Sequence, residues 1–279
     1  MAGAKDQPLV TVPHGGPHGT YTSEFSPATV ALALEGCQIL PTGIVITLTL
    51  VYFLDVISLV NYTGSLGFGQ KYVDALIGRA GSLDVKDCYE SAKHLIAIGL
   101  TKEGPGMQFV QGGSHGGFLS AHRQCNVFLT RCQCCKLTVM DSVIGQYPDF
   151  FSATVMRNPV IAVGEIASVS DIPDWAFDEF GVAFGPQSLI TPNVFESLQK
   201  ASPIAHIDAV KAPVLLLIGE ADQRVPPSQS KNYYYGLKGR GKEVEMLMFP
   251  NNGHSLDSVE AELVGWEASK NWFARFAKR

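Results

Sequence analysis

The sequence has few charged residues and no long basic segment. Charged residues make up 17% of the 279 residues, and the formal net charge is −5. A protein that binds nucleic acid or an anionic membrane surface usually presents a basic patch. We therefore expect neither a nucleic-acid nor a membrane partner. The hydrophobic content of 46% also excludes a disordered chain and indicates a globular one with a sizeable core.

The first residues lack the apolar run of a secretory signal. The chain begins Met-Ala-Gly-Ala-Lys-Asp-Gln-Pro, and a signal peptide would carry an uninterrupted hydrophobic stretch here. Without an export signal, the six cysteines are better interpreted as thiols in a reducing compartment than as disulfides. The sequence therefore predicts a cytoplasmic location.

Four cysteines lie close together, but their spacing is not that of a common zinc site. Cys125, Cys132, Cys134 and Cys135 follow the pattern C-x6-C-x-C-C, which matches no familiar finger or ribbon. A thiol-rich surface insertion explains them better than metal binding. The glycine-rich segment Asn61–Gly69 similarly lacks the Gly-Lys-Ser/Thr ending of a phosphate-binding loop. A structural loop is therefore the better interpretation of Asn61–Gly69.

The longest apolar run is Ile44–Val60, which Asp55 interrupts. A membrane-spanning helix needs about 20 apolar residues, so this run is of borderline length. Its richness in valine, isoleucine and threonine favours a buried strand or a strand pair. A transmembrane helix is the alternative.

Patterns of strands and helices alternate along the rest of the chain. We predict strands over 9–12, 107–111, 153–156, 214–218 and 244–249, and helices over 26–35, 84–98, 114–122, 227–237 and 259–276. Such alternation predicts an α/β fold with a mostly parallel sheet and helices on both of its faces. The length suits a single domain over 1–279.

Two of these helices have features at particular positions. Asp84 and Asp87 lie near the start of the helix over 84–98, where the helix dipole favours acidic side chains. The last helix is amphipathic, and we expect its buried side to carry apolar residues at helical spacing. These are Leu263, Trp266, Phe273 and Phe276.

The segment Gly112-Gly113-Ser114-His115-Gly116 fits the pattern G-x-S-x-G. It follows an apolar strand and precedes a run of small residues, which is the setting of a nucleophile elbow. The flanking glycines allow the strained turn that lifts the Ser114 hydroxyl clear of the sheet. The same turn leaves the amide of His115 pointing to where an oxyanion would form.

A second glycine-rich segment follows the first predicted strand. Pro13-His14-Gly15-Gly16 has the character of the second half of an oxyanion hole, because glycines let a backbone amide approach a substrate carbonyl. A plain Gly/Pro turn is the alternative. The long connection over 166–201 is expected to carry substrate contacts or a lid.

Ser114, Asp222 and His254 each follow a predicted strand. The carboxyl ends of parallel strands meet at one edge of a sheet, so we expect these side chains to be neighbours. An imidazole can take the proton of a serine hydroxyl, and a carboxylate fixes and stabilises that imidazole. The chain order Ser, Asp, His is that of the α/β-hydrolases. Considered singly, Asp222 is explained as a capping residue and His254 as a surface loop residue. Considered together with Ser114, the two residues predict a catalytic triad.

Several strings in the chain resemble the catalytic domain of the acylaminoacyl-peptidases, in the prolyl oligopeptidase family of serine peptidases. They are Pro13–His18, Asn61–Gly69, Gly112–Phe118, Arg157–Val160, Asp171–Trp175 and Gly219–Pro226. The resemblance implies an α/β-hydrolase fold that needs no metal or organic cofactor. It also implies hydrolysis of N-acylated peptides with release of an N-acyl amino acid.

The resemblance also implies a role for each matching residue. Ser114 would be the nucleophile, Asp222 the orienting carboxylate and His254 the base. Gly16 and His115 would donate the two oxyanion amides, and Arg157 would contact substrate. The sequence leaves open whether the chain forms a homo-oligomer.

The chain departs from the family in three places. The family's N-terminal β-propeller is absent, which predicts a hydrolase domain truncated at its N-terminus, and the stretches near 37–57 and 123–143 resemble insertions. Two alternatives to an acylaminoacyl-peptidase therefore stay open. One is a broad serine esterase, because no propeller would filter substrates by size. The other is a folded but inactive form that acts as a partner.

Overall fold

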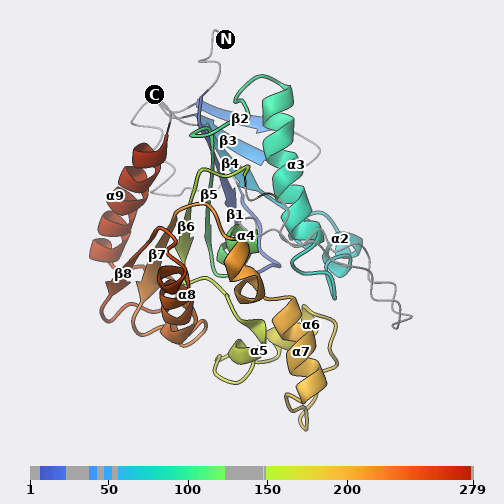
Figure 1. Ribbon diagram of the computed structural model, residues 1–279. Coiled ribbons are helices and arrows are strands. Elements are labelled where there is room, and N and C mark those ends of the chain that lie inside the picture. Colours follow the sequence, from blue (N-terminus) through green and yellow to red (C-terminus); the bar gives the residue numbers. More distant parts are fainter. Residues whose placement is uncertain are drawn as a thin grey trace.

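The computed structural model describes residues 7–22, 38–42, 47–51, 56–122, 147 and 149–277, with the backbone alone over 38–42 and 47–51. An eight-stranded sheet in the order β2-β3-β4-β1-β5-β6-β7-β8 runs through the middle of this structure (Figure 1). The strands are β1 Leu9–Pro13, β2 Gln38–Thr42, β3 Thr47–Val51, β4 Val56–Val60, β5 Gln108–Gly113, β6 Ala153–Arg157, β7 Val214–Gly219 and β8 Val244–Phe249. The strands from β4 to β8 pair in parallel, and only β2–β3 and β3–β4 pair antiparallel. The predicted mostly parallel sheet is confirmed.

The described parts of the apolar run Ile44–Val60, which are residues 47–51 and 56–60, form strands, as their β-branched composition predicts. β3 and β4 lie antiparallel, with Thr47 opposite Val60 and Val51 opposite Val56. This confirms the strand-pair interpretation. Nowhere in the described ranges is there a helix with the length and apolar character needed to cross a bilayer.

Helices cover both faces of the sheet (Figure 1). They are α2 Gln70–Asp74, α3 Leu83–Ala97, α4 His115–His122, α5 Val163–Ile166, α6 Trp175–Asp178, α7 Pro192–Lys200, α8 Pro227–Gly239 and α9 Val259–Phe276, with the 3₁₀ helix η1 Pro203–Ala209. Because side chains alternate along a strand, Leu215 and Leu217 pack toward α9. Leu216 and Ile218 pack on the other face, against α4 and α8. β7 is therefore buried along its whole length, as a central parallel strand should be.

One of the four apolar residues expected on the buried side of α9 is misplaced, whereas Phe273 is buried and Phe276 packs against the same core. Leu263 is 57% exposed, so placing it on the buried side was wrong. The residues that face the sheet are Ala261, Gly265, Ser269, Trp272 and Phe273. Three of these are small: Ala261, Gly265 and Ser269. A Cβ on Gly265 would lie 3.5 Å from a methyl carbon of Leu217, an ordinary contact with β7.

Two of the predicted features lie outside the described residues. They are the helix over 26–35 and the cysteine-rich stretch over 123–143. The helix that precedes this stretch is in place, and every residue of α4 is buried.

The turn from β5 into α4 is built on contacts that leave no room for a side chain. A Cβ on Gly112 would lie 2.2 Å from the carbonyl oxygen of Gly116. A Cβ on Gly116 would lie 2.3 Å from the carbonyl oxygen of Pro13, at the end of β1. Both distances are far below a van der Waals contact, so glycine is required for β1, β5 and α4 to approach this closely.

We predict that Gly112→Ala destabilises the chain by about 3 kcal/mol, because the added methyl group meets backbone that cannot move aside. The measurement is urea unfolding of the variant against the parent chain. Gly113→Ala is the matched control, because a Cβ there would lie 3.6 Å from Arg157, an ordinary contact. Equal stability of the two variants would contradict this account of the turn.

Candidate active site

The carboxyl ends of the parallel strands meet at one edge of the sheet, and a cavity opens there. Its volume is about 320 Å³. Its lining residues come from the segments that follow β1, β5, β6, β7 and β8 and from the helices α5 and α6. They are Gly15, Gly16, Ser114, Val160, Ile166, Ser170, Ile172, Trp175, Arg224, Val225 and His254. The predicted meeting of strand ends therefore occurs, and Ser114 and His254 share one cavity.

Ser114 sits at the apex of the turn between β5 and α4. Its backbone has φ of 57°, in the left-handed region that non-glycine residues rarely adopt. Its amide donates to the carbonyl of Arg157, and its own carbonyl accepts from the amide of Phe118. α4 begins at His115, and the first amides of a helix have no acceptor within the helix. The N–H of His115 is thus available to a ligand beside the Ser114 hydroxyl.

Asp222 and His254 form a short hydrogen bond. His254 Nδ1 lies 2.7 Å from Asp222 Oδ2, and the Asp222 side chain is fully buried. The other carboxylate oxygen accepts from the amides of Arg224 and Val225, at 2.9 and 3.0 Å. These bonds fix the carboxylate, which in turn fixes the imidazole with Nε2 left free for a partner in the cavity.

Asn158 forms hydrogen bonds with the two loops that carry Asp222 and His254. Its side-chain amide donates to the carbonyls of Gly253 and His254, at 3.3 and 2.9 Å. The side-chain oxygen Oδ1 of Asn158 accepts from the backbone amide of Gly219, at the end of β7, at 2.9 Å. Asn158 itself has φ of 41°, a region that asparagine tolerates better than most residues. The string Arg157–Val160 marked this segment as similar to the family, but the sequence did not indicate this connecting role.

The segment after β1 is held by bonds from two other parts of the chain. The Trp175 indole donates to the carbonyl of Gly16 at 2.9 Å, and the Tyr62 hydroxyl donates to the carbonyl of His14 at 2.9 Å. Burial lowers the pKa of His14 to about 4, so its ring is neutral at neutral pH. Gly15 lies against Ser114, since a Cβ on Gly15 would be 3.3 Å from that of Ser114.

Two arginines differ in their relation to the cavity. Arg157, the predicted substrate contact, donates through its guanidinium to the carbonyl of Leu256 and to Glu262 and is not among the residues that line the cavity. Arg224, which the sequence analysis did not single out, does line it. Two hydrogen bonds from Arg224 hold the pKa of Asp171 below its ordinary value.

The side chains that meet here include a hydroxyl, an imidazole and a carboxylate, which are the types that nucleophilic catalysis uses. Within the parts of the chain that the structure describes, no group of three His, Cys, Asp or Glu side chains is placed to hold a metal ion. The cysteines of the predicted insertion lie outside those parts.

Comparison with known proteins identifies the family. The model of the prolyl oligopeptidase family matches residues 54–125 and 138–279, which is more than half of the chain. The chain belongs to the prolyl oligopeptidase family. The resemblance seen in the motifs is therefore confirmed.

Curated relatives within this prolyl oligopeptidase group are similar over most of the chain. The acylamino-acid-releasing enzyme of Arabidopsis thaliana is 36% identical over 278 residues, which are 98% of this chain and 31% of the relative. That of Rattus norvegicus is 37% identical over 257 residues, which are 91% of this chain and 29% of the relative. The chain thus spans about a third of the length of these relatives.

A solved structure shows the same fold. The acylaminoacyl peptidase of Pyrococcus horikoshii superimposes with a TM-score of 0.75 at 22% identity, over 99% of this chain and 38% of the other. The α/β-hydrolase fold predicted from the order of Ser114, Asp222 and His254 is confirmed.

We predict that Asn158→Asp lowers kcat by about tenfold, because a carboxylate cannot donate to the His254 loop and a misplaced catalytic group is inefficient. Steady-state kinetics on an N-acyl anilide measure the effect. Asn251→Asp is the matched control, since Asn251 has a similar φ of 58° but is exposed. Unchanged kcat in the Asn158 variant, or an equal loss in both variants, would contradict the role of Asn158 in connecting β7 to the His254 loop.

Proposed function

We propose that this chain is a serine peptidase that hydrolyses N-acylated peptides and releases an N-acyl amino acid. The observation that carries the proposal is the 2.7 Å bond between Asp222 and His254 at the cavity that Ser114 lines. Membership of the prolyl oligopeptidase family and the similarity to acylamino-acid-releasing enzymes support it. No metal or organic cofactor enters the mechanism.

In this mechanism the Ser114 oxygen attacks the substrate carbonyl carbon while His254 Nε2 takes the hydroxyl proton. Asp222 holds Nδ1 and stabilises the imidazolium that forms. The tetrahedral oxygen accepts from the N–H groups of His115 and Gly16, and the start of α4 adds the positive end of a helix dipole. His254 then protonates the leaving amine, and water hydrolyses the acyl-enzyme by the same steps.

The chemistry of the cavity favours a substrate with a blocked N-terminus. Its apolar wall comprises Val160, Ile166, Ile172, Trp175 and Val225. None of its lining residues in the described part of the chain is acidic, so a free ammonium group would find no carboxylate there. An acyl group is uncharged and suits this wall. The volume of about 320 Å³ is at the small end of ligand cavities, which favours a short acylated residue.

Arg157 as a substrate contact stays a prediction. So do the cytoplasmic location, a homo-oligomeric state and the arrangement of the chain as one domain with two insertions.

We predict that a fluorophosphonate probe labels the chain and that Ser114→Ala abolishes labelling and lowers hydrolysis of an N-acetyl-alanine anilide by about a millionfold. The reason is that the probe and the substrate both need the Ser114 oxygen. Gel fluorescence and anilide release measure the two effects. Ser228→Ala is the control, because Ser228 lies in α8, away from the cavity.

Three other results would each count against the proposal. Well-folded parent chain that takes no label indicates the inactive form. Labelling that survives in Ser114→Ala places the nucleophile elsewhere. Rapid hydrolysis of p-nitrophenyl esters with no anilide hydrolysis indicates a broad esterase.

A further inference from the structure

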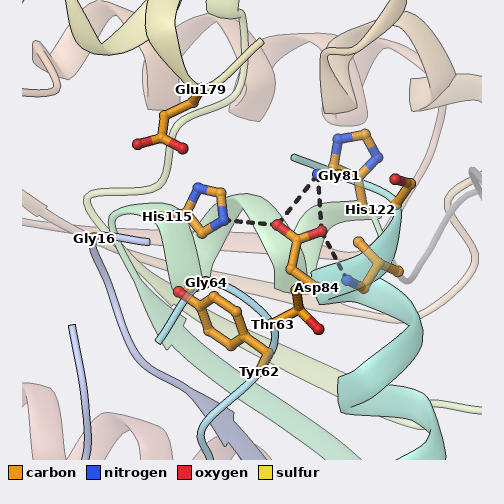
Figure 2. A network of polar contacts seen from close by, with 12 residues as sticks. Gly16, Tyr62, Thr63, Gly64, Gly81, Asp84, His115, His122 and Glu179 are labelled. Carbon is orange, nitrogen blue, oxygen red and sulfur yellow. Dashed lines mark hydrogen bonds and ion pairs between the residues drawn. The ribbon is translucent and has the colours of Figure 1, made fainter. Parts of the chain in front are cut away.

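A fully buried imidazole–carboxylate pair is formed by Asp84 and His115, the residue that follows Ser114 in the chain (Figure 2). His115 Nε2 is 2.8 Å from Asp84 Oδ2, and both side chains are completely excluded from solvent. Burial of two such groups costs solvation free energy unless their hydrogen-bond geometry is good. Removal of one group leaves the other buried without its partner. The mechanism above uses the amide of His115 and leaves this side-chain pair without a role.

The carboxylate of Asp84 is held independently of His115. Asp84 is the second residue of α3, and its Oδ1 accepts from the amides of Gly81 and Val85, both at 2.9 Å. The amide of Gly81 also donates to Oδ2, at 3.2 Å. Together these bonds fix the carboxylate at the start of α3, with Oδ2 directed toward His115 of α4. Asp84 is therefore a rigid anchor, not a side chain that merely complements the dipole of its own helix.

The imidazole of His115 depends on that anchor for its orientation. Its ring packs among the rings of Tyr62, Phe118 and Trp175, with centroid separations of 5.9, 5.1 and 5.9 Å. Its Nδ1 is buried and has no hydrogen-bond partner in the described part of the chain. Figure 2 shows the carboxylate of Glu179 on the side of the ring away from Asp84. Aromatic packing confines the ring, and the hydrogen bond to Asp84 fixes the direction of Nε2.

The orientation of this ring bears on the reaction because His115 follows the nucleophile. Ser114 is held in the left-handed region, which persists only where the surroundings enforce it. The peptide between Ser114 and His115 carries the N–H proposed to bind the oxyanion. Because the bond to Asp84 fixes the His115 ring at Nε2, rotation of the peptide between Ser114 and His115 is limited.

We propose that Asp84 is a positioning residue of the oxyanion site, which fixes the His115 imidazole and through it the N–H of His115. This inference rests on the proposed function, since it assigns a task in the same reaction. Asp84 does not touch the substrate. It acts from α3, through the side chain of the first residue of α4.

The test uses Asp84→Asn and His115→Phe in the 279-residue chain. The asparagine of the first variant can still accept from Gly81 and Val85 through its one oxygen, but it offers an NH₂ group where Oδ2 was. Phenylalanine keeps the ring packing of His115 and cannot hydrogen-bond. Each variant should lower kcat on an N-acetyl-alanine anilide by about 10- to 100-fold with KM nearly unchanged. Affinity for a trifluoromethyl ketone, whose hemiketal carries an oxyanion, should fall by the same factor.

The double variant distinguishes positioning from a general loss of stability. If Asp84 acts through His115, Asp84→Asn with His115→Phe should lose no more kcat than either single variant. Asp87→Asn is the matched control: Asp87 lies about one turn further along α3 and accepts from the amide and hydroxyl of Thr63, so its kcat should stay at the parent value.

The inference is overturned if folded Asp84→Asn keeps the parent kcat, if the loss appears in KM alone, or if the two losses multiply. If Asp84→Asn does not fold, parent kcat and ketone affinity in His115→Phe overturn it equally. A parent chain that neither takes the fluorophosphonate label nor hydrolyses the anilide is a separate result, because it refutes the proposed function itself.

Discussion

The close approach of β1, β5 and α4 is the constraint on which the site depends. Gly112 and Gly116 let these backbones come within distances that exclude even a Cβ, and the turn between them holds Ser114 at a φ of 57°. Such a conformation costs roughly 1–3 kcal/mol and persists only because its neighbours enforce it. The contact between Gly116 and the carbonyl of Pro13 also brings the segment after β1 beside Ser114. One packing contact thus places both the serine and a proposed oxyanion donor.

The other half of the site is built by polar contacts between loops. Two backbone amides fix one oxygen of Asp222, and the second oxygen meets His254. Asn158 then connects the end of β7 to the loop that carries His254. Buried side-chain amides that are fully paired make such loops rigid, which a catalytic arrangement requires. The rigid part of the site therefore extends well beyond the three residues of the proposed triad.

Much of the fold follows from the sequence because its signals are local. The bounds of β8 and α9 agree with the prediction, and β7 is recognisable as a continuous apolar run. The proximity of Asp222 and His254 also follows from the sequence, because the carboxyl ends of parallel strands lie at one edge of a sheet. Side-chain size misled the prediction at Leu263, since α9 packs through small residues that hydrophobicity alone does not mark.

Long-range polar partners could not be predicted in this way. Asp84 looked like a dipole-compensating residue, but its partner His115 is 31 positions away in the sequence. The bonds of Asn158 to Gly253 and His254 span 95 and 96 positions, and its bond to Gly219 spans 61. Arg224 binds Asp171 across 53 positions. Such pairs depend on how elements pack in three dimensions, and no periodicity or spacing encodes them. Arg157 shows the converse, because a motif marked it without indicating what its guanidinium contacts.

A crystal structure of the chain after reaction with a fluorophosphonate tests the central claim most directly. The account predicts phosphorus bonded to Ser114 Oγ and a phosphonyl oxygen within roughly 3 Å of the backbone nitrogens of His115 and Gly16. His254 Nε2 should lie within hydrogen-bonding reach of the adduct. A phosphonyl oxygen turned to solvent, or an imidazole of His254 that has left the cavity, would contradict the account.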